Sequence, residues 1–262
     1  MFSRLRVHAS FVLFVSMLSS TSSSAAELQD RTSRAYDSYR AAAEAKFLSR
    51  QHAPDGPPSG GVTARPANQG GIISIPGGLV HHWFGASFIR GVNLQTVLDV
   101  SRKYDTYPSI YKEIVASQVL ECDGDKYRVL MRLKEGEAGV TAVLDVRSTV
   151  RYVFPEKGPV FTFLNSEEIR EVRGAGTADE VLLPPGRDSG YLWRFDMFTS
   201  FVEFPDGVYV ETETLALSRT IPPMLGWFIK PIARRLGRKS VVRSLEELQA
   251  ATLATTSSAS VR

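Results

Sequence analysis

The sequence predicts an α+β fold in which a curved antiparallel sheet of about seven strands wraps around a long C-terminal helix, with an extra helix near the N terminus. Three observations support this prediction. Hydrophobic residues make up 43% of the 262 residues, enough for a substantial core. Strand-like segments separated by tight turns fill the middle of the chain. One long helical segment follows at residues 222–253, and a single helix can cover a sheet only if the sheet curves around it.

The N-terminal residues have the pattern of a signal peptide. Arg4 and Arg6 precede an apolar run at residues 9–18, and small residues follow as far as Ala26. The run is too short to span a bilayer as a permanent helix. We therefore expect residues 1–26 to be removed and the protein to be periplasmic or secreted; an uncleaved membrane anchor is the alternative.

Removal of the signal peptide lowers the formal net charge from +3 to +1, because it takes away two arginines and no acidic residue. A nearly neutral domain has no electrostatic reason to bind nucleic acid, and we expect none.

The next segment, residues 27–71, divides into a helix and a linker. The helix is expected at residues 28–51, which contain no glycine or proline, and its sparse apolar positions place it on a surface. Residues 52–71 contain many prolines and glycines, which disfavour regular structure. The folded domain is then expected at residues 72–254, followed by a disordered tail at residues 255–262.

The domain begins with a strand and two helical segments. A strand is expected at residues 78–89, which are rich in aromatic and branched side chains. A helix follows at residues 93–104, with Asn93 as its N-cap, and a short helical turn at residues 108–112.

Six strands and the terminal helix complete the domain. Turn signals such as Asp123-Gly124 separate the strands, which are expected at residues 114–122, 126–133, 140–154, 159–172, 191–204 and 208–219. Pro222 and Pro223 begin the terminal helix, since proline is favourable in a first turn, and Pro231 should kink it.

A ligand cavity is expected between the curved sheet and the terminal helix, where such sites are common. His82 is the inward histidine in this prediction, because Phe84, Ala86 and Phe88 share its face of the strand. The predicted lining consists of His82, Phe84, Met131, Leu144, Tyr152, Trp193, Phe195, Met197, Trp227 and Phe228.

The last hairpin separates apolar and charged side chains. A two-residue turn at Asp206 and Gly207 would place large side chains such as Trp193 and Phe195 opposite small ones. The other side would then carry Arg194, Asp196, Glu211, Glu213 and Arg219. Two interpretations are open: a solvent face, or a paired network inside the cavity that holds a ligand carboxylate.

No metal, cofactor or catalytic residue is predicted. Cys122 is the only cysteine, so it forms no internal disulfide, and an apolar buried position is expected for it. The histidines are not spaced with other ligands as in a metal site. The sequence also contains no nucleophile elbow, phosphate loop or dinucleotide fingerprint.

The order of elements resembles that of the helix-grip superfamily, which includes START domains, polyketide cyclases and aromatases. The resemblance covers residues 78–253 and includes YPSIY at 107–111 and PPMLGW at 222–227. The hairpin segments 191–194 and 208–211 look like those of uncharacterised secreted bacterial members. The resemblance implies a cavity that binds lipids, sterols, polyketides or quinones; no catalytic motif is shared across the superfamily.

Three hypotheses about function follow. The first is an exported, monomeric carrier that buries an apolar small molecule. The second is a cyclase-like or dehydratase-like enzyme that uses His82, or Arg194 and Asp196, as acid and base. The third is an interaction protein of the cell envelope that uses the helix at 28–51 as its contact. The sequence favours the first.

The terminal helix also carries a set of basic residues: Lys230, Arg234, Arg235, Arg238, Lys239 and Arg243. They form either an ordinary solvated face or a surface for transient contact with anionic lipid headgroups.

Overall fold

The computed structural model of the chain describes residues 26–50, 52, 61–68, 70–137, 140–221 and 226–259. Apart from Ala26, the predicted signal peptide lies outside the described residues. No helix in the described part of the chain has the length and apolar character needed to cross a membrane.

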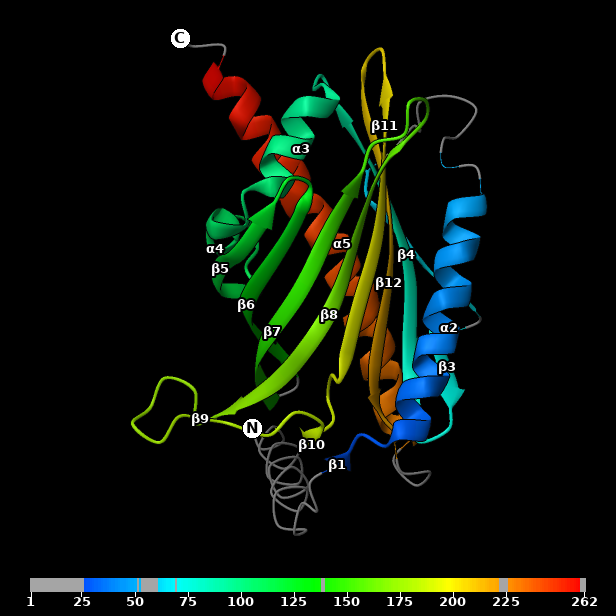
Figure 1. Ribbon diagram of the computed structural model, residues 1–262, viewed down its shortest axis with the longest axis vertical. Helices are drawn as coiled ribbons and strands as arrows, with labels where there is room; N and C mark the ends of the chain where they lie inside the picture. Colours follow the sequence, from blue (N-terminus) through cyan, green and yellow to red (C-terminus); the bar gives the residue numbers. More distant parts are fainter. Residues whose placement is uncertain are drawn as a thin grey trace, which may run out of the picture.

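Seven long strands form one curved antiparallel sheet (Figure 1). They are β4 (Gly78–Arg90), β5 (Ile114–Asp123), β6 (Lys126–Glu137), β7 (Val140–Val153), β8 (Val160–Arg173), β11 (Arg194–Phe204) and β12 (Gly207–Arg219). Their order across the sheet is β4-β12-β11-β8-β7-β6-β5. Each long strand from β5 to β12 therefore lies beside the next long strand in the chain, and β4, the first, pairs with β12, the last. The predicted sheet is confirmed. Cys122 of β5 is exposed, so the buried position expected for it is wrong.

Short strands extend this sheet at its margins. β2 (Thr63–Pro66) and β3 (Ile72–Ile75) both pair with β4, and β9 (Val181–Leu182) pairs with β8. Separately, β1 (Ala26–Glu27) pairs with β10 (Arg187–Asp188). The expectation that residues 52–71 lack regular structure is therefore wrong for β2, where proline is tolerated because the strand lies at a sheet edge.

The helices of the domain follow the predicted order. α3 (Leu94–Arg102) starts after Asn93, whose side chain accepts a hydrogen bond from the Thr96 backbone N–H at 2.9 Å, so the predicted N-cap is confirmed. A 3₁₀ turn, η1 (Tyr104–Thr106), leads into α4 (Tyr107–Ile110). α5 (Gly226–Ala259) continues through most of the segment expected to be a disordered tail, which contains no glycine or proline to end it.

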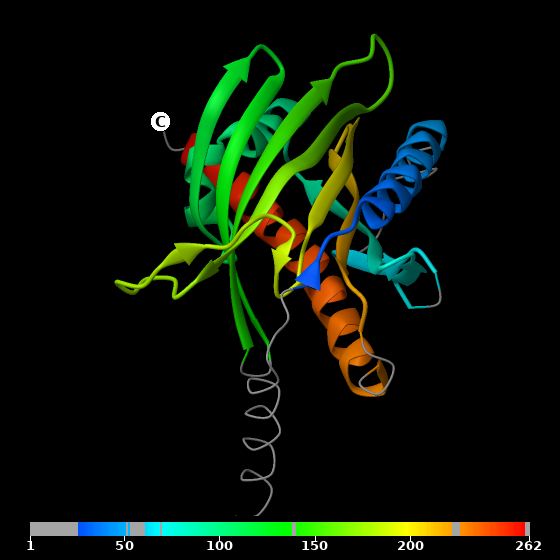
Figure 2. The same ribbon diagram turned by 60° about the horizontal axis from the view of Figure 1, so that its bottom comes forward.

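α5 and α3 cover the concave face of the sheet. Figure 2 shows α5 running across one side of the curved strands, with α2 on the other side. Val241, Leu245 and Leu248 of α5 are buried in one cluster with Trp83 of β4 and Val210 of β12. This cluster is the main core, and its position confirms that the sheet wraps around the terminal helix.

α2 (Asp30–Ser49) covers part of the opposite, convex face. Its apolar side is one residue wide, because Tyr36, Ala43 and Phe47 follow one another at intervals of seven and four. These side chains form a second core with Val80, Phe161, Phe163, Trp193, Phe198, Leu215 and Leu217. The expected surface helix is therefore a packed layer of the domain.

The last hairpin has a turn different from the predicted one. Phe204 pairs with Gly207, so the two turn residues are Pro205 and Asp206. Proline at the second position and glycine at the fourth is a favoured combination for a four-residue turn. A Cβ on Gly207 would lie 2.3 Å from the Ile89 carbonyl oxygen, which requires glycine there. The register shifts by two residues, so each side chain keeps its predicted face.

Candidate functional site

Two rows of side chains cross the concave face of β11, β12 and β4. In the first row, Phe195 lies opposite Ala216, which in turn lies opposite His81. In the second, Met197 lies opposite Thr214, followed by Trp83. Trp83 belongs to the core beneath α5. Because directly opposed residues of an antiparallel sheet share a face, both rows point to the side that α5 covers.

These rows form an accessible area that we call the concave patch: His81, Phe195, Met197, Thr214 and Ala216. All five are partly exposed, whereas Trp83 and the other side chains of the core around them are buried. Two large side chains, Phe195 and Met197, thus lie beside two smaller ones, Thr214 and Ala216.

His81 is the titratable residue of the concave patch. Its Nε2 lies 2.8 Å from Ser218 Oγ, and the Ser218 hydroxyl donates to the Arg219 carbonyl oxygen at 3.2 Å. A serine has a single hydroxyl hydrogen, so Ser218 accepts from His81 Nε2–H and the lone pair of His81 is on Nδ1. Burial lowers the pKa of His81 to about 4, which makes the imidazole neutral at pH 7.

The structure places five of the ten predicted lining residues on the concave face. Two of these, Phe195 and Met197, belong to the concave patch. Met131 and Tyr152 are buried in the main core. Leu144 is buried in a small adjoining cluster against which Phe195 packs. The side chains of Trp227 and Phe228 lie outside the described part of the chain.

Three predicted lining residues lie on the convex face instead. His82 contacts Glu213 and Tyr39, and Phe84 lies beneath the guanidinium groups of Arg50 and Arg65. The prediction selected the wrong histidine because β4 is buried on both faces, by α2 and by α5, so apolar neighbours did not distinguish them.

Trp193 precedes β11 and packs in the convex core. Its indole nitrogen donates to Asp188 Oδ1 at 3.1 Å. The predicted alternation of faces failed here because Trp193 lies outside the regular strand that begins at Arg194.

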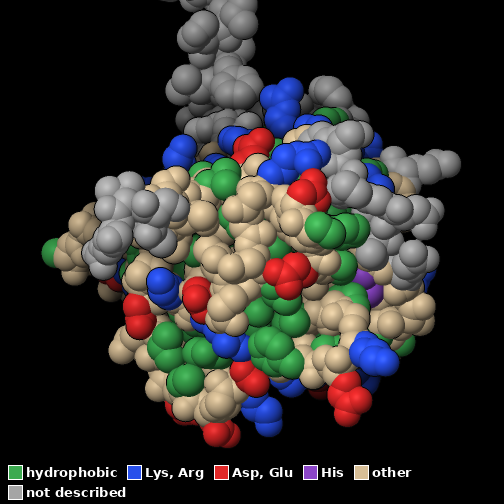
Figure 3. All heavy atoms as spheres, turned by 90° about the horizontal axis from the view of Figure 1, so that it is seen from above, with side chains coloured by type: hydrophobic (Ala, Val, Ile, Leu, Met, Phe, Trp, Pro, Cys, Tyr) green, Lys and Arg blue, Asp and Glu red, His purple; other side chains and the backbone are tan. Residues whose placement is uncertain are grey.

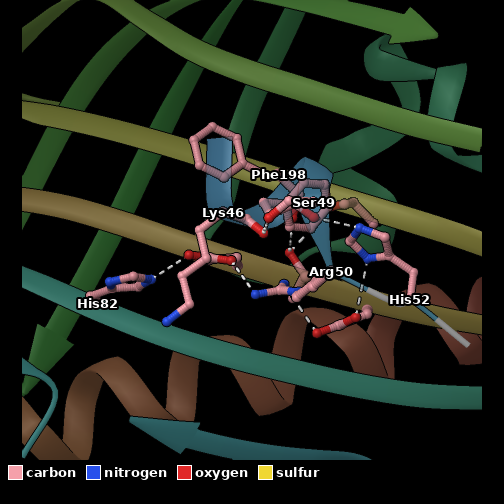
Figure 4. Close-up of polar contacts among 11 residues, drawn as sticks. Lys46, Ser49, Arg50, His52, His82 and Phe198 are labelled. Atoms are coloured by element: carbon pink, nitrogen blue, oxygen red, sulfur yellow. Dashed lines mark hydrogen bonds and ion pairs between the residues drawn. The ribbon is translucent and has the colours of Figure 1, made fainter. Parts of the chain in front are cut away.

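The charged residues of the last hairpin contribute to a buried network on the convex face, here called the α2 network: Tyr39, Arg50, His52, His82, Glu211 and Glu213. Figure 4 shows Arg50 between His82 and His52. Arg50 forms ion pairs with Glu213 Oε2 at 2.8 Å and with Glu211 Oε1 at 3.1 Å. His82 Nε2 lies 2.6 Å from Glu213 Oε1. Glu213 is only 2% exposed, and a carboxylate so deeply buried needs such partners.

The same network attaches the C-terminal end of α2 to β4 and β12. The Tyr39 hydroxyl lies 2.8 Å from His82 Nδ1. His52 Nε2 donates to the Phe47 carbonyl oxygen at 2.6 Å, and its Nδ1 lies 3.3 Å from Glu211 Oε2. Each charged side chain of the network has an ion-pair partner, although Arg50 Nε, Arg50 Nη2 and Glu213 Oε2 are buried without a hydrogen bond. The network connects α2 to the sheet.

The other charged residues of the hairpin are also held by protein groups. Asp196 accepts from the Tyr36 hydroxyl at 2.5 Å and from the Asn165 amide at 2.6 Å, and burial raises the pKa of Asp196. Arg194 and Arg219 each donate to a backbone carbonyl oxygen, of Glu167 and Ser189 respectively.

The solvent-face interpretation is therefore wrong for Asp196 and Glu213, which are buried, but holds for Arg219, which is exposed. The interpretation as a network inside the cavity is wrong. The acidic residues Asp196, Glu211 and Glu213 are not on an open solvent face, because α2 covers them, and they are not on the concave face. Sequence reasoning missed α2 as their partner, since Tyr36 and Asp196 are 160 positions apart. The acid–base groups suggested for an enzyme do not converge on the concave patch.

Two hollows open on the surface of the described residues. One, of about 700 Å³, lies between α4 and α5, and its lining includes Ile110, Val242 and Arg238. The other, of about 390 Å³, lies at the turn between β11 and β12. Neither includes the concave patch. Seen from above, basic, acidic and apolar side chains are interspersed (Figure 3), which agrees with the small net charge.

Comparison with solved structures shows the fold. A STAR-related lipid transfer protein fragment from Xanthomonas axonopodis is 14% identical, and the match covers 74% of this chain and 99% of that chain with a TM-score of 0.50. Human STARD10 is 10% identical over 86% of this chain and 80% of that one, also with a TM-score of 0.50. Human StAR-related lipid transfer protein 5 is 15% identical over 86% and 99%, with a TM-score of 0.48.

No protein-family model matches the chain. No curated protein matches its sequence. The structural likeness and the strand order together establish an α+β helix-grip fold of the START type.

Proposed function

We propose that this protein is an exported, monomeric carrier that holds an apolar small molecule against the concave patch, next to α5. The observation that carries the proposal is the partial exposure of Phe195 and Met197 on a face where the neighbouring apolar side chains are buried. Burying an apolar surface stabilises a complex by roughly 25 cal/mol per Å² before the costs of ordering. The lipid-transfer name of the Xanthomonas axonopodis fragment, which matches with a TM-score of 0.50, supports the same class of ligand.

The N-terminal half of α5 supports a further part of this proposal, transient contact with a membrane. Residues 226–245 contain no acidic residue. Lys230, Arg234, Arg235 and Arg238 are exposed and have no ion-pair partner in the described part of the chain. Clustered cations of this kind are attracted to anionic headgroups. A carrier that collects or delivers an apolar molecule at a membrane would use such a surface.

A dye-binding experiment tests the proposal. The full chain is expressed in a Gram-negative host, and the protein is recovered from the periplasm, where we expect its first residue to be Glu27. After extraction of bound lipid, Nile red, an uncharged apolar dye, is titrated in and its fluorescence measured. We expect saturable binding, and Met197→Lys should weaken it at least about tenfold, because a charge on the concave patch disfavours an apolar ligand.

The matched control is Val115→Lys. Val115 is 47% exposed on β5, so a lysine there adds the same charge at a solvated position and should leave dye binding unchanged. Circular dichroism of both variants checks that they fold. Absence of dye binding by the folded wild type, or equal binding by the two variants, would overturn the proposal.

A further inference from the structure

The imidazole Nδ1 of His81, on the concave patch, is not used by the fold. His81 Nε2 is engaged by Ser218, as described above, but His81 Nδ1 has no hydrogen-bond partner among the described residues. The imidazole is partly exposed, within a row whose other members are Ala216 and Phe195. A hydrogen-bond acceptor is therefore present in the middle of an apolar surface.

The strand positions around His81 on the concave face carry no charged side chain. The concave-face positions of β4 are occupied by His81, Trp83, Gly85, Ser87 and Ile89. Those of β11 and β12 are occupied by Phe195, Met197, Thr199, Phe201, Val208, Val210, Thr212, Thr214, Ala216 and Ser218. None of these residues is acidic or basic. An ionised ligand group placed against these strands would lose hydration and gain no counter-charge from the sheet.

We infer that His81 Nδ1 accepts a hydrogen bond from a hydroxyl group of an uncharged, otherwise apolar ligand. This inference rests on the proposed function and specifies its ligand class. A ketone or an ether cannot donate to the Nδ1 lone pair, and a carboxylate gains no counter-charge from the strand positions around it. The low pKa of His81 supports the inference, because it keeps the imidazole neutral at pH 7.

Three matched probes test the inference at pH 7: 2-naphthol, 2-methoxynaphthalene and 2-naphthoate, each titrated by calorimetry. We expect 2-naphthol to bind about tenfold more tightly than 2-methoxynaphthalene, a difference of about 1.4 kcal/mol, and 2-naphthoate to bind most weakly. His81→Phe should abolish the preference for 2-naphthol. His81→Asn should retain it, because the asparagine oxygen can occupy the position of Nδ1.

The outcomes separate this inference from the proposed function. If all three probes bind wild type and His81→Phe equally, and Met197→Lys weakens them all, the carrier proposal holds and the role of His81 is overturned. Tightest binding of 2-naphthoate also overturns it. If no probe binds and Nile red does not bind either, both proposals fail together.

Discussion

His81 and His82 show how adjacent residues of one strand acquire opposite environments. His82 contributes to the α2 network, whereas His81 lies on the concave patch with a single protein partner. The sequence reveals that only one of them can face the helix. It does not reveal which, because aromatic and branched residues occupy both faces of β4. Packing of α2 against the sheet determines which face His82 occupies, and no local sequence pattern predicts this packing.

Burial of neutral His81 should make the protein less stable in acid. Its pKa is about 4 in the folded chain against an ordinary value of 6.5, so between these pH values the unfolded chain binds more protons than the folded one. The unfolding free energy should therefore fall as the pH decreases from 6.5 to 4, by up to about 3 kcal/mol from this group.

Urea unfolding of wild type and His81→Asn at pH 7 and pH 4.5 measures this effect. The variant should lose less stability than wild type, since asparagine does not titrate. Asp196, whose pKa is raised by burial, and the other acidic groups are present in both proteins and cancel in the comparison. Equal losses would show that His81 is not held neutral by burial.

At the scale of elements, the strands, α3 and the terminal helix could be predicted from periodicity and turn residues. The role of α2 could not. Its apolar side is one residue wide, and its partners, such as Phe198 and Leu215, lie far away in the sequence. The β11–β12 turn was misplaced by one residue because two adjacent pairs, Pro205-Asp206 and Asp206-Gly207, are both plausible turns.

The packing of α2 leads to a prediction about Phe47. This side chain is 0% exposed and contacts the rings of Phe161, Phe163 and Phe198. Phe47→Ala should lower the unfolding free energy by about 3–5 kcal/mol, because it leaves a cavity in the convex core.

The adjacent residue Leu48 provides the control, since it is 50% exposed. Leu48→Ala should change the unfolding free energy by no more than about 0.5 kcal/mol. Urea denaturation measures both. If the two variants were equally stable, α2 would not be an integral layer of the domain, and the hypothesis of a free contact helix would regain support.

For the whole molecule, the order of elements was sufficient to predict the helix-grip architecture. A sheet with one face to bury and one long helix to cover it has few compact solutions. The position of the charged residues was not predictable at this scale. Asp196, Glu211 and Glu213 resemble an ordinary solvated strand face in sequence, and only the added α2 layer gives them buried partners. The sequence did predict that Phe195 and Met197 face the terminal helix.

Methionine methyl NMR shows directly whether an apolar ligand binds against the concave patch. Met197 belongs to the concave patch, whereas Met131 is buried in the main core. The protein is labelled with ¹³C at the methionine methyl groups, Met197→Leu assigns the Met197 signal, and 2-naphthol is added to saturation. We expect the Met197 signal to shift, because an aromatic ring lies against it in the complex, and the Met131 signal to stay in place. An unchanged Met197 signal at saturating 2-naphthol would show that the ligand does not bind at the concave patch.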